Sequence, residues 1–205
     1  PPAGVLLTPR APEAVAEAVA ALRAAGAELL AGGGIAEEAA GYAFQPTLLR
    51  VSGKRFLEAP HELQNEAFGQ VCLLVLAESE EQMLQVAHAL EGNLTGTIYS
   101  DTAGSDDAQY DVIAPVLRTR VGRLINDRMP TGVAVSPAQN HGGPYPATGH
   151  PAFTAVGIPA SLLRFSALHS YDNVRPHRLP PALRDANPTG TLWRLVDGKW
   201  TTADA

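Results

Sequence analysis

A regular alternation of strand-like and helix-like segments between residues 71 and 126 constrains the fold of this chain more than any other feature. Residues 71–76 (VCLLVL) are six consecutive apolar residues, typical of a parallel strand that is covered on both faces. The pattern continues as helix, strand, helix and strand over residues 80–90, 95–99, 106–117 and 123–126. Such an alternation predicts βαβ units in a parallel sheet, and hence an α/β fold.

The boundaries of the predicted helices carry local signals. Ser79 and Gln82 have the spacing of a capping box, in which the serine accepts a backbone N–H and Gln82 reaches back. Pro115 predicts that the first half of the second helix is irregular or kinked. On these two helices, the apolar residues expected to face the protein core are Met83, Val86, Ala87, Leu90, Ile113, Val116 and Leu117.

Shorter signals precede this region, and a different pattern follows it. Residues 15–22 have helical spacing before a stop at Gly26, and residues 47–51 (TLLRV) read as a strand. Residues 129–157 are rich in Gly and Pro and are expected to be mainly loop. Residues 162–174 are predicted to be an isolated extended segment, for which a second subunit is a natural pairing partner. The expected assembly is a homo-oligomer.

Composition excludes several classes of function. The 15 Lys and Arg residues never cluster, so no nucleic-acid groove is expected. No run of 18 apolar residues occurs, so no membrane span is expected. The one cysteine, Cys72, fits a reducing cytoplasm. Because the chain starts at Pro1 without a signal-peptide pattern, we interpret it as trimmed or as an excerpt of something longer.

Glu66 and Phe68 are the candidate binding residues, because they place a carboxylate and an aromatic ring two residues apart, just before an apolar strand. The carboxylate can accept hydrogen bonds from both hydroxyls of a ribose, and the ring can pack on the sugar and its base. A nicotinamide nucleotide site needs this combination. The alternative interpretation is an ordinary loop carboxylate beside a core aromatic residue.

Several segments, taken in order, resemble the C-terminal part of aldehyde dehydrogenases. Residues 66–69 (EAFG) resemble that family's Glu-Ile-Phe-Gly-Pro signature, although Ala67 and Gln70 replace its Ile and Pro. Other phrases that resemble the family are residues 26–33, 41–49, 122–126 and 141–148. The resemblance extends from about Gly4 to Ala186, and it implies a partial catalytic domain over residues 1–157. It also implies a C-terminal oligomerisation strand and irregular tail over residues 158–205.

The phrase at residues 141–148 (HGGPYPAT), with the ending at residues 193–198 (WRLVDG), resembles a particular subgroup. This subgroup contains the α-ketoglutaric semialdehyde (2,5-dioxovalerate) dehydrogenases and is similar to fatty aldehyde dehydrogenases that use NADP. The resemblance implies that His141, Gly142, Pro144 and Tyr145 line the pocket for an aldehyde substrate. Either NADP or NAD is the implied cofactor, and the sequence decides neither the cofactor nor the aldehyde.

The catalytic residues of this family lie outside the present chain. The resemblance implies a cysteine thiolate that attacks the aldehyde, hydride transfer to the nicotinamide, and hydrolysis of a thioester. The nucleophilic cysteine, the general-base glutamate and the nucleotide-binding domain all precede the matched region. Cys72 follows the Glu-x-Phe-Gly motif, so it is not that nucleophile, and we expect it to be buried and inert. The isolated chain should therefore be catalytically silent.

Two interpretations of the chain are open. It is either part of an oxidoreductase, as the resemblance implies, or a non-catalytic assembly module that keeps the same sheet. A hydrolase using His141 has little support, because no Gly-x-Ser-x-Gly motif is present. No metal site is expected, because the six histidines lack the spacing of a metal-binding motif.

Overall fold

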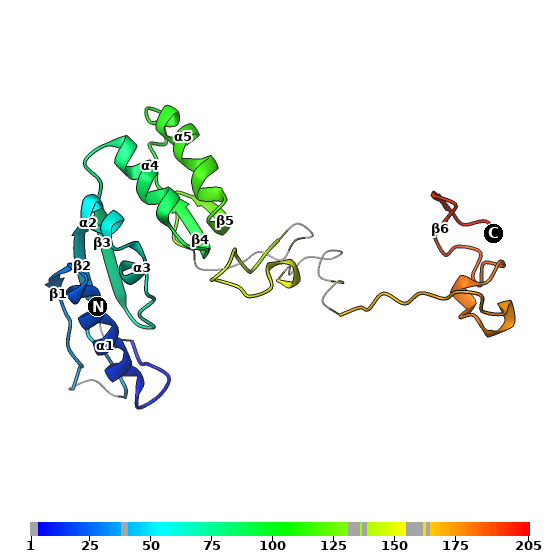
Figure 1. Ribbon diagram of the computed structural model, residues 1–205, viewed down its shortest axis with the longest axis horizontal. Helices are drawn as coiled ribbons and strands as arrows, with labels where there is room; N and C mark the ends of the chain where they lie inside the picture. Colours follow the sequence, from blue (N-terminus) through cyan, green and yellow to red (C-terminus); the bar gives the residue numbers. More distant parts are fainter. Residues whose placement is uncertain (1–3, 38–40, 131–135, 137–138, 155–161, 163–164) are drawn as a thin grey trace. The chain divides into compact units, whose positions relative to one another are not determined.

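The computed structural model describes residues 4–37, 41–130, 136, 139–154, 162 and 165–205. The chain divides into two compact units, residues 1–164 and residues 165–205 (Figure 1). The first unit contains most of the helices and strands. The second contains two short 3-10 helices and a small hairpin.

A three-stranded sheet in the order β1-β2-β3 forms the first part of the larger unit. Its strands are β1 (Glu28–Ala31), β2 (Thr47–Ser52) and β3 (Val71–Leu76). β1 is antiparallel to β2, whereas β2 and β3 are parallel, with Thr47 opposite Val71. The strands predicted at residues 47–51 and 71–76 are therefore confirmed.

Helix α1 (Ala11–Ala24) precedes this sheet and ends as the sequence predicts. Gly26 follows it with a φ of 107°, a backbone conformation that side chains with a Cβ rarely adopt. Short helices α2 (Gly53–Glu58) and α3 (Pro60–Leu63) connect β2 to β3. This connection makes the parallel β2–β3 pair possible, because parallel neighbours need a crossover.

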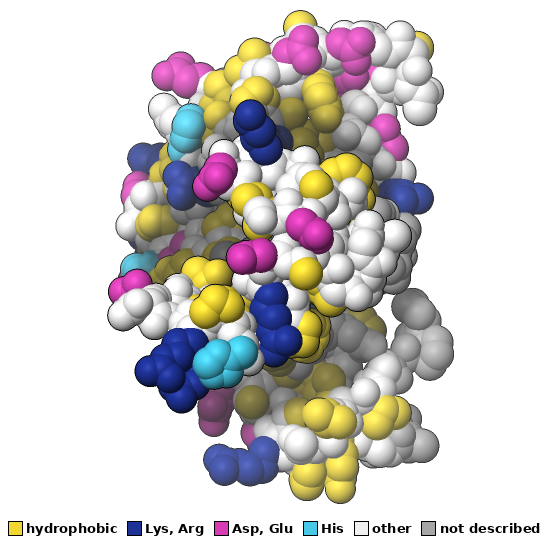
Figure 2. All heavy atoms as spheres, turned by 90° about the vertical axis from the view of Figure 1, so that its right-hand side faces the viewer, with side chains coloured by type: hydrophobic (Ala, Val, Ile, Leu, Met, Phe, Trp, Pro, Cys, Tyr) yellow, Lys and Arg dark blue, Asp and Glu magenta, His cyan; other side chains and the backbone are white. Residues whose placement is uncertain are grey.

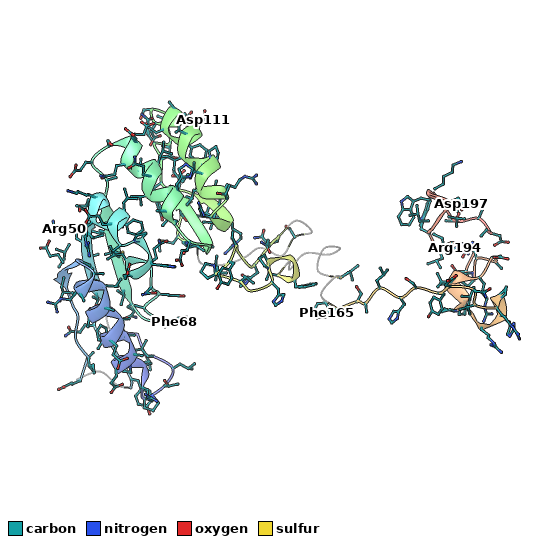
Figure 3. All side chains as sticks on the ribbon, in the orientation of Figure 1. Arg50, Phe68, Asp111, Phe165, Arg194 and Asp197 are labelled. Carbon is teal, nitrogen blue, oxygen red and sulfur yellow. The ribbon has the colours of Figure 1, made fainter. Side chains whose placement is uncertain are left out.

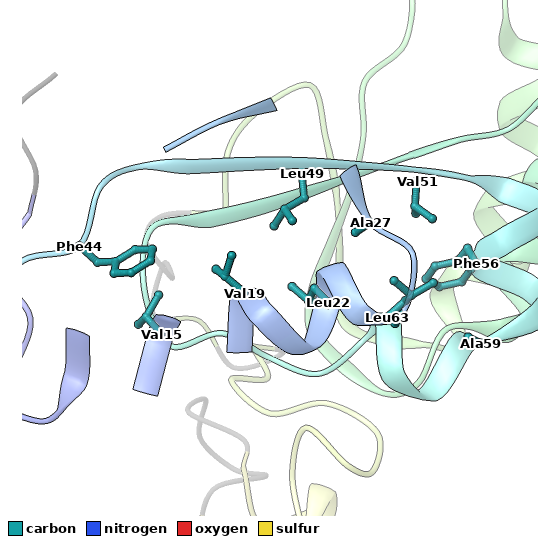
Figure 4. Close-up of a cluster of buried hydrophobic side chains, with 11 residues drawn as sticks. Val15, Val19, Leu22, Ala27, Phe44, Leu49, Val51, Phe56, Ala59 and Leu63 are labelled. Atoms are coloured by element: carbon teal, nitrogen blue, oxygen red, sulfur yellow. The ribbon is translucent and has the colours of Figure 1, made fainter. Parts of the chain in front are cut away.

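The core of the larger unit lies between α1 and one face of the three-stranded sheet (Figure 4). Phe44, Phe56, Leu49 and Val15 are its largest fully buried side chains. They come from a loop, α2, β2 and α1, so the cluster ties four segments together. A fully buried side chain of this size stabilises the fold by about 1.5–3 kcal/mol through removal of apolar surface from water.

Strand β3 is covered on one face rather than two. Val71, Leu73 and Val75 pack against the core, whereas Leu74 and Leu76 on the opposite face are 40% and 50% exposed. Cys72 is also exposed. The predictions of a doubly covered strand and a buried Cys72 are therefore wrong for the chain as described, since no described element packs over this face.

A second, two-stranded sheet pairs β4 (Asn93–Ile98) with β5 (Val121–Asn126) in parallel. Helix α5 (Asp107–Arg118) connects them, so β4-α5-β5 is a βαβ unit. The helix runs through Pro115 without interruption. Pro115 has no N–H to donate to the Asp111 oxygen, so the helix lacks that one hydrogen bond.

Helix α4 (Glu80–Ala89) joins the two sheets, and its start confirms the serine cap, although Gln82 reaches back to the N–H of Glu78 and not to that of Ser79. The Gln82 N–H donates to Ser79 Oγ at 3.2 Å, and Gln82 Oε1 accepts from the Glu78 N–H at 2.9 Å. The prediction of one continuous parallel sheet over residues 71–126 is wrong, however. Among the described residues, β3 pairs with β2 and β4 with β5, but β3 and β4 do not pair.

The smaller unit is organised around Arg194. Its hairpin consists of β6 (Arg194–Val196) and β7 (Lys199–Thr201), joined by a turn at Asp197 and Gly198, which both have positive φ. The Arg194 guanidinium donates to the backbone oxygens of Arg184, Asp185 and Ala203 at 2.6, 3.0 and 2.7 Å. One arginine thereby holds three segments of the unit together.

The opposite face of this hairpin is apolar and exposed. Trp193, Leu195 and Trp200 are 66%, 59% and 68% exposed. Apolar side chains also reach the surface elsewhere on the face shown in Figure 2. The 3-10 helices η3 (Pro176–Arg178) and η4 (Pro181–Leu183) precede the hairpin. At residues 162 and 165–174, where an oligomerisation strand was expected, the described positions contain no strand.

Candidate functional site

The loop between α3 and β3 contains Glu66 and Phe68, and it is fixed at its downstream end. The backbone oxygen of Gln70 accepts a hydrogen bond from the Thr47 N–H at 2.8 Å. Gly69 lies against the core, since a Cβ atom added to it would stand 2.8 Å from Val15 Cγ2. The loop therefore leaves the core at a defined place.

Both candidate side chains on this loop face solvent. Glu66 is exposed, and Phe68, labelled in Figure 3, is 79% exposed. Within the described part of the chain, no hydrogen bond or ion pair engages the Glu66 carboxylate. The Glu66 oxygens can accept two hydroxyl donors at once, and the Phe68 ring, two residues further along the chain, offers an exposed apolar face. These residues fit a ribose carrying an aromatic base.

A second loop, at residues 139–154, contains the four residues predicted to line the aldehyde pocket. Gly142 is buried, Pro144 is half-buried, and the His141 and Tyr145 side chains are exposed. The loop crosses the first residues of the two-stranded sheet. A Cβ atom on Gly92, just before β4, would stand 2.0 Å from the Pro144 backbone oxygen.

Hydrogen bonds within this loop fix its backbone. Thr154 Oγ1 donates to Asn140 Oδ1 at 2.8 Å, and the His141 N–H donates to the Thr154 oxygen at 3.1 Å. The Gly143 N–H donates to Thr148 Oγ1 at 3.0 Å. The loop can therefore present His141 and Tyr145 from a held backbone. Among the described residues, no hydrogen bond or ion pair joins this loop to Glu66 or Phe68.

Sequence reasoning missed an apolar pocket of about 580 Å³ in the larger unit. It lies between α4, α5 and β4, and Met83, Val86, Leu90, Ile113 and Leu117 are among its lining residues. These residues were identified as core-facing from their helical spacing. The pattern showed which faces of the helices are apolar, but not that part of the space beneath them is empty.

Asn126, at the end of β5, connects the strand to α5. The Tyr110 hydroxyl donates to Asn126 Oδ1 at 3.0 Å, which ties the strand to α5. The loop that follows is held instead by Asp127, whose carboxylate accepts from the Ser100 N–H at 2.7 Å.

The β4–α5 turn carries a carboxylate with a perturbed pKa. A hydrogen bond from the Ser105 side chain, followed by backbone N–H donors from Ala103 and Ser105, lowers the pKa of Asp101. Asp101 is therefore ionised at neutral pH and organises the turn. This role is structural, because its partners all belong to the same turn.

The described residues lack two kinds of feature. They contain no group of three or more His, Cys, Asp and Glu residues arranged to hold a metal ion. Nor do they contain a helix that is both long and apolar enough to cross a membrane.

Residues 2–135 match the family model described as "Aldehyde dehydrogenase family". Alpha-ketoglutaric semialdehyde dehydrogenase 2 of Azospirillum brasilense is 37% identical over 204 residues, which cover 97% of this chain and 37% of that protein. Alpha-ketoglutaric semialdehyde dehydrogenase of Acinetobacter baylyi is 36% identical over 157 residues, covering 77% of this chain and 29% of that protein. The chain thus spans between about 29% and 37% of the length of these relatives.

Solved structures show the same partial coverage. Betaine aldehyde dehydrogenase from Staphylococcus aureus superimposes with a TM-score of 0.52 at 21% identity, over 68% of this chain and 26% of that chain. An NAD-dependent aldehyde dehydrogenase from Sinorhizobium meliloti gives a TM-score of 0.51 at 25% identity, over 68% and 25% of the two chains. The mixed α/β structure therefore matches part of the fold of these enzymes.

Proposed function

This chain belongs to the aldehyde dehydrogenase family, and we propose that it supplies one part of an NAD- or NADP-dependent enzyme that oxidises an aldehyde to a carboxylic acid. The proposed substrate is an α-ketoglutaric semialdehyde of the 2,5-dioxovalerate type. The 37% and 36% identity to two dehydrogenases named for that aldehyde supports this choice. The nucleophilic cysteine and the general base belong to the part of the fold that this chain does not contain.

The role of Glu66 and Phe68 is to hold the cofactor. The bound dinucleotide would accept a hydride from the substrate. The Glu66 carboxylate would accept hydrogen bonds from both hydroxyls of the nicotinamide ribose, and Phe68 would pack beside the ribose and nicotinamide. The exposure of both side chains on a loop that is fixed at its downstream end carries this proposal. Correct placement matters because hydride transfer depends steeply on distance and angle.

The loop at residues 139–154 would form one wall of the aldehyde pocket. Its backbone is held by Asn140, Thr148 and Thr154, which leaves the His141 and Tyr145 side chains available to a substrate. A dioxovalerate carries a carboxylate, for which the His141 imidazole and the Tyr145 hydroxyl are suitable donors. Assembly through residues 162–174, within a C-terminal segment at residues 158–205, remains part of the proposal.

A chimera tests this function directly. The 205 residues replace the matching stretch of the Azospirillum brasilense enzyme, and NAD(P)H formation is followed with α-ketoglutaric semialdehyde and with a fatty aldehyde. We expect oxidation of the semialdehyde by the chimera and none by the 205 residues alone. A folded chimera that oxidises neither aldehyde would refute the proposal, and a preference for the fatty aldehyde would refute the proposed substrate.

A further inference from the structure

Arg120, in the turn just before β5, is a half-buried cation without a matching anion in the described part of the chain. Its Nε atom is buried and has no hydrogen-bond partner there. None of the ion pairs between described residues involves Arg120. A buried donor without a partner costs free energy, and the cost is larger for a charged group. Such a group calls for an explanation, and an anionic ligand would supply the missing partner.

Arg120 stands close to the loop at residues 139–154. Its backbone oxygen accepts a hydrogen bond from the Asn93 N–H at 2.8 Å. The backbone oxygen of the same Asn93 lies against the loop, since a Cβ atom added to Gly143 would collide with it. Arg120 and the loop that contains His141 therefore contact a common residue.

The alternation of side chains along β5 indicates which way Arg120 faces. Val121 lines the pocket beneath α4 and α5. Gly122 faces the loop, because a Cβ atom on it would collide with the Gly142 oxygen. Successive side chains point to opposite faces of a strand, so we expect Arg120 on the same face as Gly122. This is the face that the loop covers.

We propose that Arg120 binds the carboxylate of the aldehyde substrate and thereby selects a 2,5-dioxovalerate over an uncharged aldehyde. The inference rests on the proposed function, from which it takes the substrate class. A guanidinium is permanently charged and can donate two parallel hydrogen bonds to one carboxylate. The exposed His141 and Tyr145 side chains can add hydrogen bonds, but an imidazole is charged only when protonated and a tyrosine hydroxyl is neutral.

Other basic residues near the loop suit this role less well. Residues 56–117 contain no Lys or Arg, so α4, β4 and most of α5 offer no such cation. Arg118, in the last turn of α5, is exposed, and water competes with a carboxylate for an exposed guanidinium. Arg123 shares the face of Val121 by the same alternation. Arg120 is therefore the best placed of these arginines.

Kinetics of the chimera test the proposed selection. Arg120→Met removes the charge and should lower kcat/KM for α-ketoglutaric semialdehyde about tenfold or more, mainly through KM. For pentanal, which has five carbons and no carboxylate, kcat/KM should change less than about twofold. Arg120→Lys should restore part of the loss, because it keeps the charge without the two parallel bonds. Arg118→Met is the matched control and should leave both substrates unaffected.

A binding experiment on the 205-residue chain does not depend on activity. The probe is α-ketoglutarate, the product of the proposed oxidation, which keeps the carboxylate that the semialdehyde carries. Nuclear magnetic resonance follows the Arg120 Nε–H signal, which is assigned by its loss in Arg120→Met. We expect this signal to move with α-ketoglutarate and not with potassium chloride of the same ionic strength. The Arg118 signal should stay in place.

Three results would overturn the inference: equal losses of kcat/KM for the two aldehydes, equal effects of Arg120→Met and Arg118→Met, or an Arg120 signal that does not respond to α-ketoglutarate. Circular dichroism shows whether Arg120→Met folds, and Arg120→Lys replaces it in the kinetics if it does not. A chimera that oxidises neither aldehyde would count against the proposed function, while the binding experiment would still decide on Arg120. An active chimera that keeps its preference after Arg120→Met would have the opposite meaning.

Discussion

Gly122 lies so close to Gly142 that a Cβ atom on Gly122 would stand 1.6 Å from the Gly142 carbonyl oxygen. The contact joins the start of β5 to the loop that contains His141 and Tyr145. The Gly142 oxygen belongs to the backbone, so it cannot move aside as the end of a flexible side chain could.

The first prediction follows from this contact. Gly122→Ala should displace the loop at residues 139–154 and lower the free energy of unfolding by about 1–3 kcal/mol through overpacking. Gly149→Ala is the matched control, because nothing lies within 4 Å of a Cβ atom at Gly149. Denaturant unfolding of both variants checks the difference, and equal stability of the two would contradict the contact.

The second prediction concerns the core. Leu49 is 0% exposed, so Leu49→Ala should lower the free energy of unfolding by about 2–5 kcal/mol. Leu7 is 93% exposed, and Leu7→Ala should change it by less than about 0.5 kcal/mol. Urea denaturation followed by far-UV circular dichroism measures both values. A small loss for Leu49→Ala would show that the described core is not the stabilising one.

The third prediction uses the single cysteine. Because Cys72 is exposed, a thiol reagent should modify the native chain at a rate within about tenfold of its rate in denaturant. Mass spectrometry after timed quenching gives both rates, and no other residue interferes. Reaction only after unfolding would restore the prediction of a buried Cys72.

The fourth prediction concerns the smaller unit. Arg194→Ala removes donors to three backbone oxygens and should disorder the hairpin. Arg194→Lys should rescue it poorly, because an ammonium group lacks the planar fork of a guanidinium. The chain's two tryptophans, Trp193 and Trp200, flank this contact, so near-UV circular dichroism reports on it directly. Lys199→Ala is the control, and an unchanged spectrum for Arg194→Ala would refute the role.

The fifth prediction tests the cofactor role in the chimera. Glu66→Gln should lower kcat about tenfold or more and change the KM for the nucleotide less, because a charge-assisted hydrogen bond positions the reacting ring. Glu62→Gln, in α3, is the control on a neighbouring exposed carboxylate. Identical kinetics for the two variants would remove Glu66 from the site.

Local patterns in the sequence predicted α1, β2 and the elements from β3 to β5, whereas they missed β1, α2, α3 and the β6–β7 hairpin and all contacts between distant residues. The strand at residues 71–76 and the cap at Ser79 depend on neighbouring residues, and both are confirmed. The resemblance to aldehyde dehydrogenases is confirmed as well. The pairing of β3 with β2 rather than β4, and the exposure of Cys72, depend on which other segments are present. No local periodicity encodes that information.

The candidate site shows the same division. The sequence predicted both candidate loops, the one with Glu66 from its residue types and the one with His141 from the resemblance to aldehyde dehydrogenases. It could not identify the contact between Gly122 and Gly142, which are 20 positions apart and have no side chains to form a pattern. One signal could have suggested this contact: Gly92 and Gly122 lie at the starts of two strands, and residues 141–149 are rich in glycine.

Gln64 is a residue that few other amino acids can replace, because its side chain makes three hydrogen bonds. Its side-chain amide donates to the Pro60 and Ala89 oxygens and accepts from the Glu91 N–H. A carboxylate at this position would lose both donors, a hydrocarbon would lose all three bonds, and asparagine would be one methylene too short to span them. Position 64 should therefore tolerate few replacements, and it is also the first residue of the loop between α3 and β3 that contains Glu66 and Phe68.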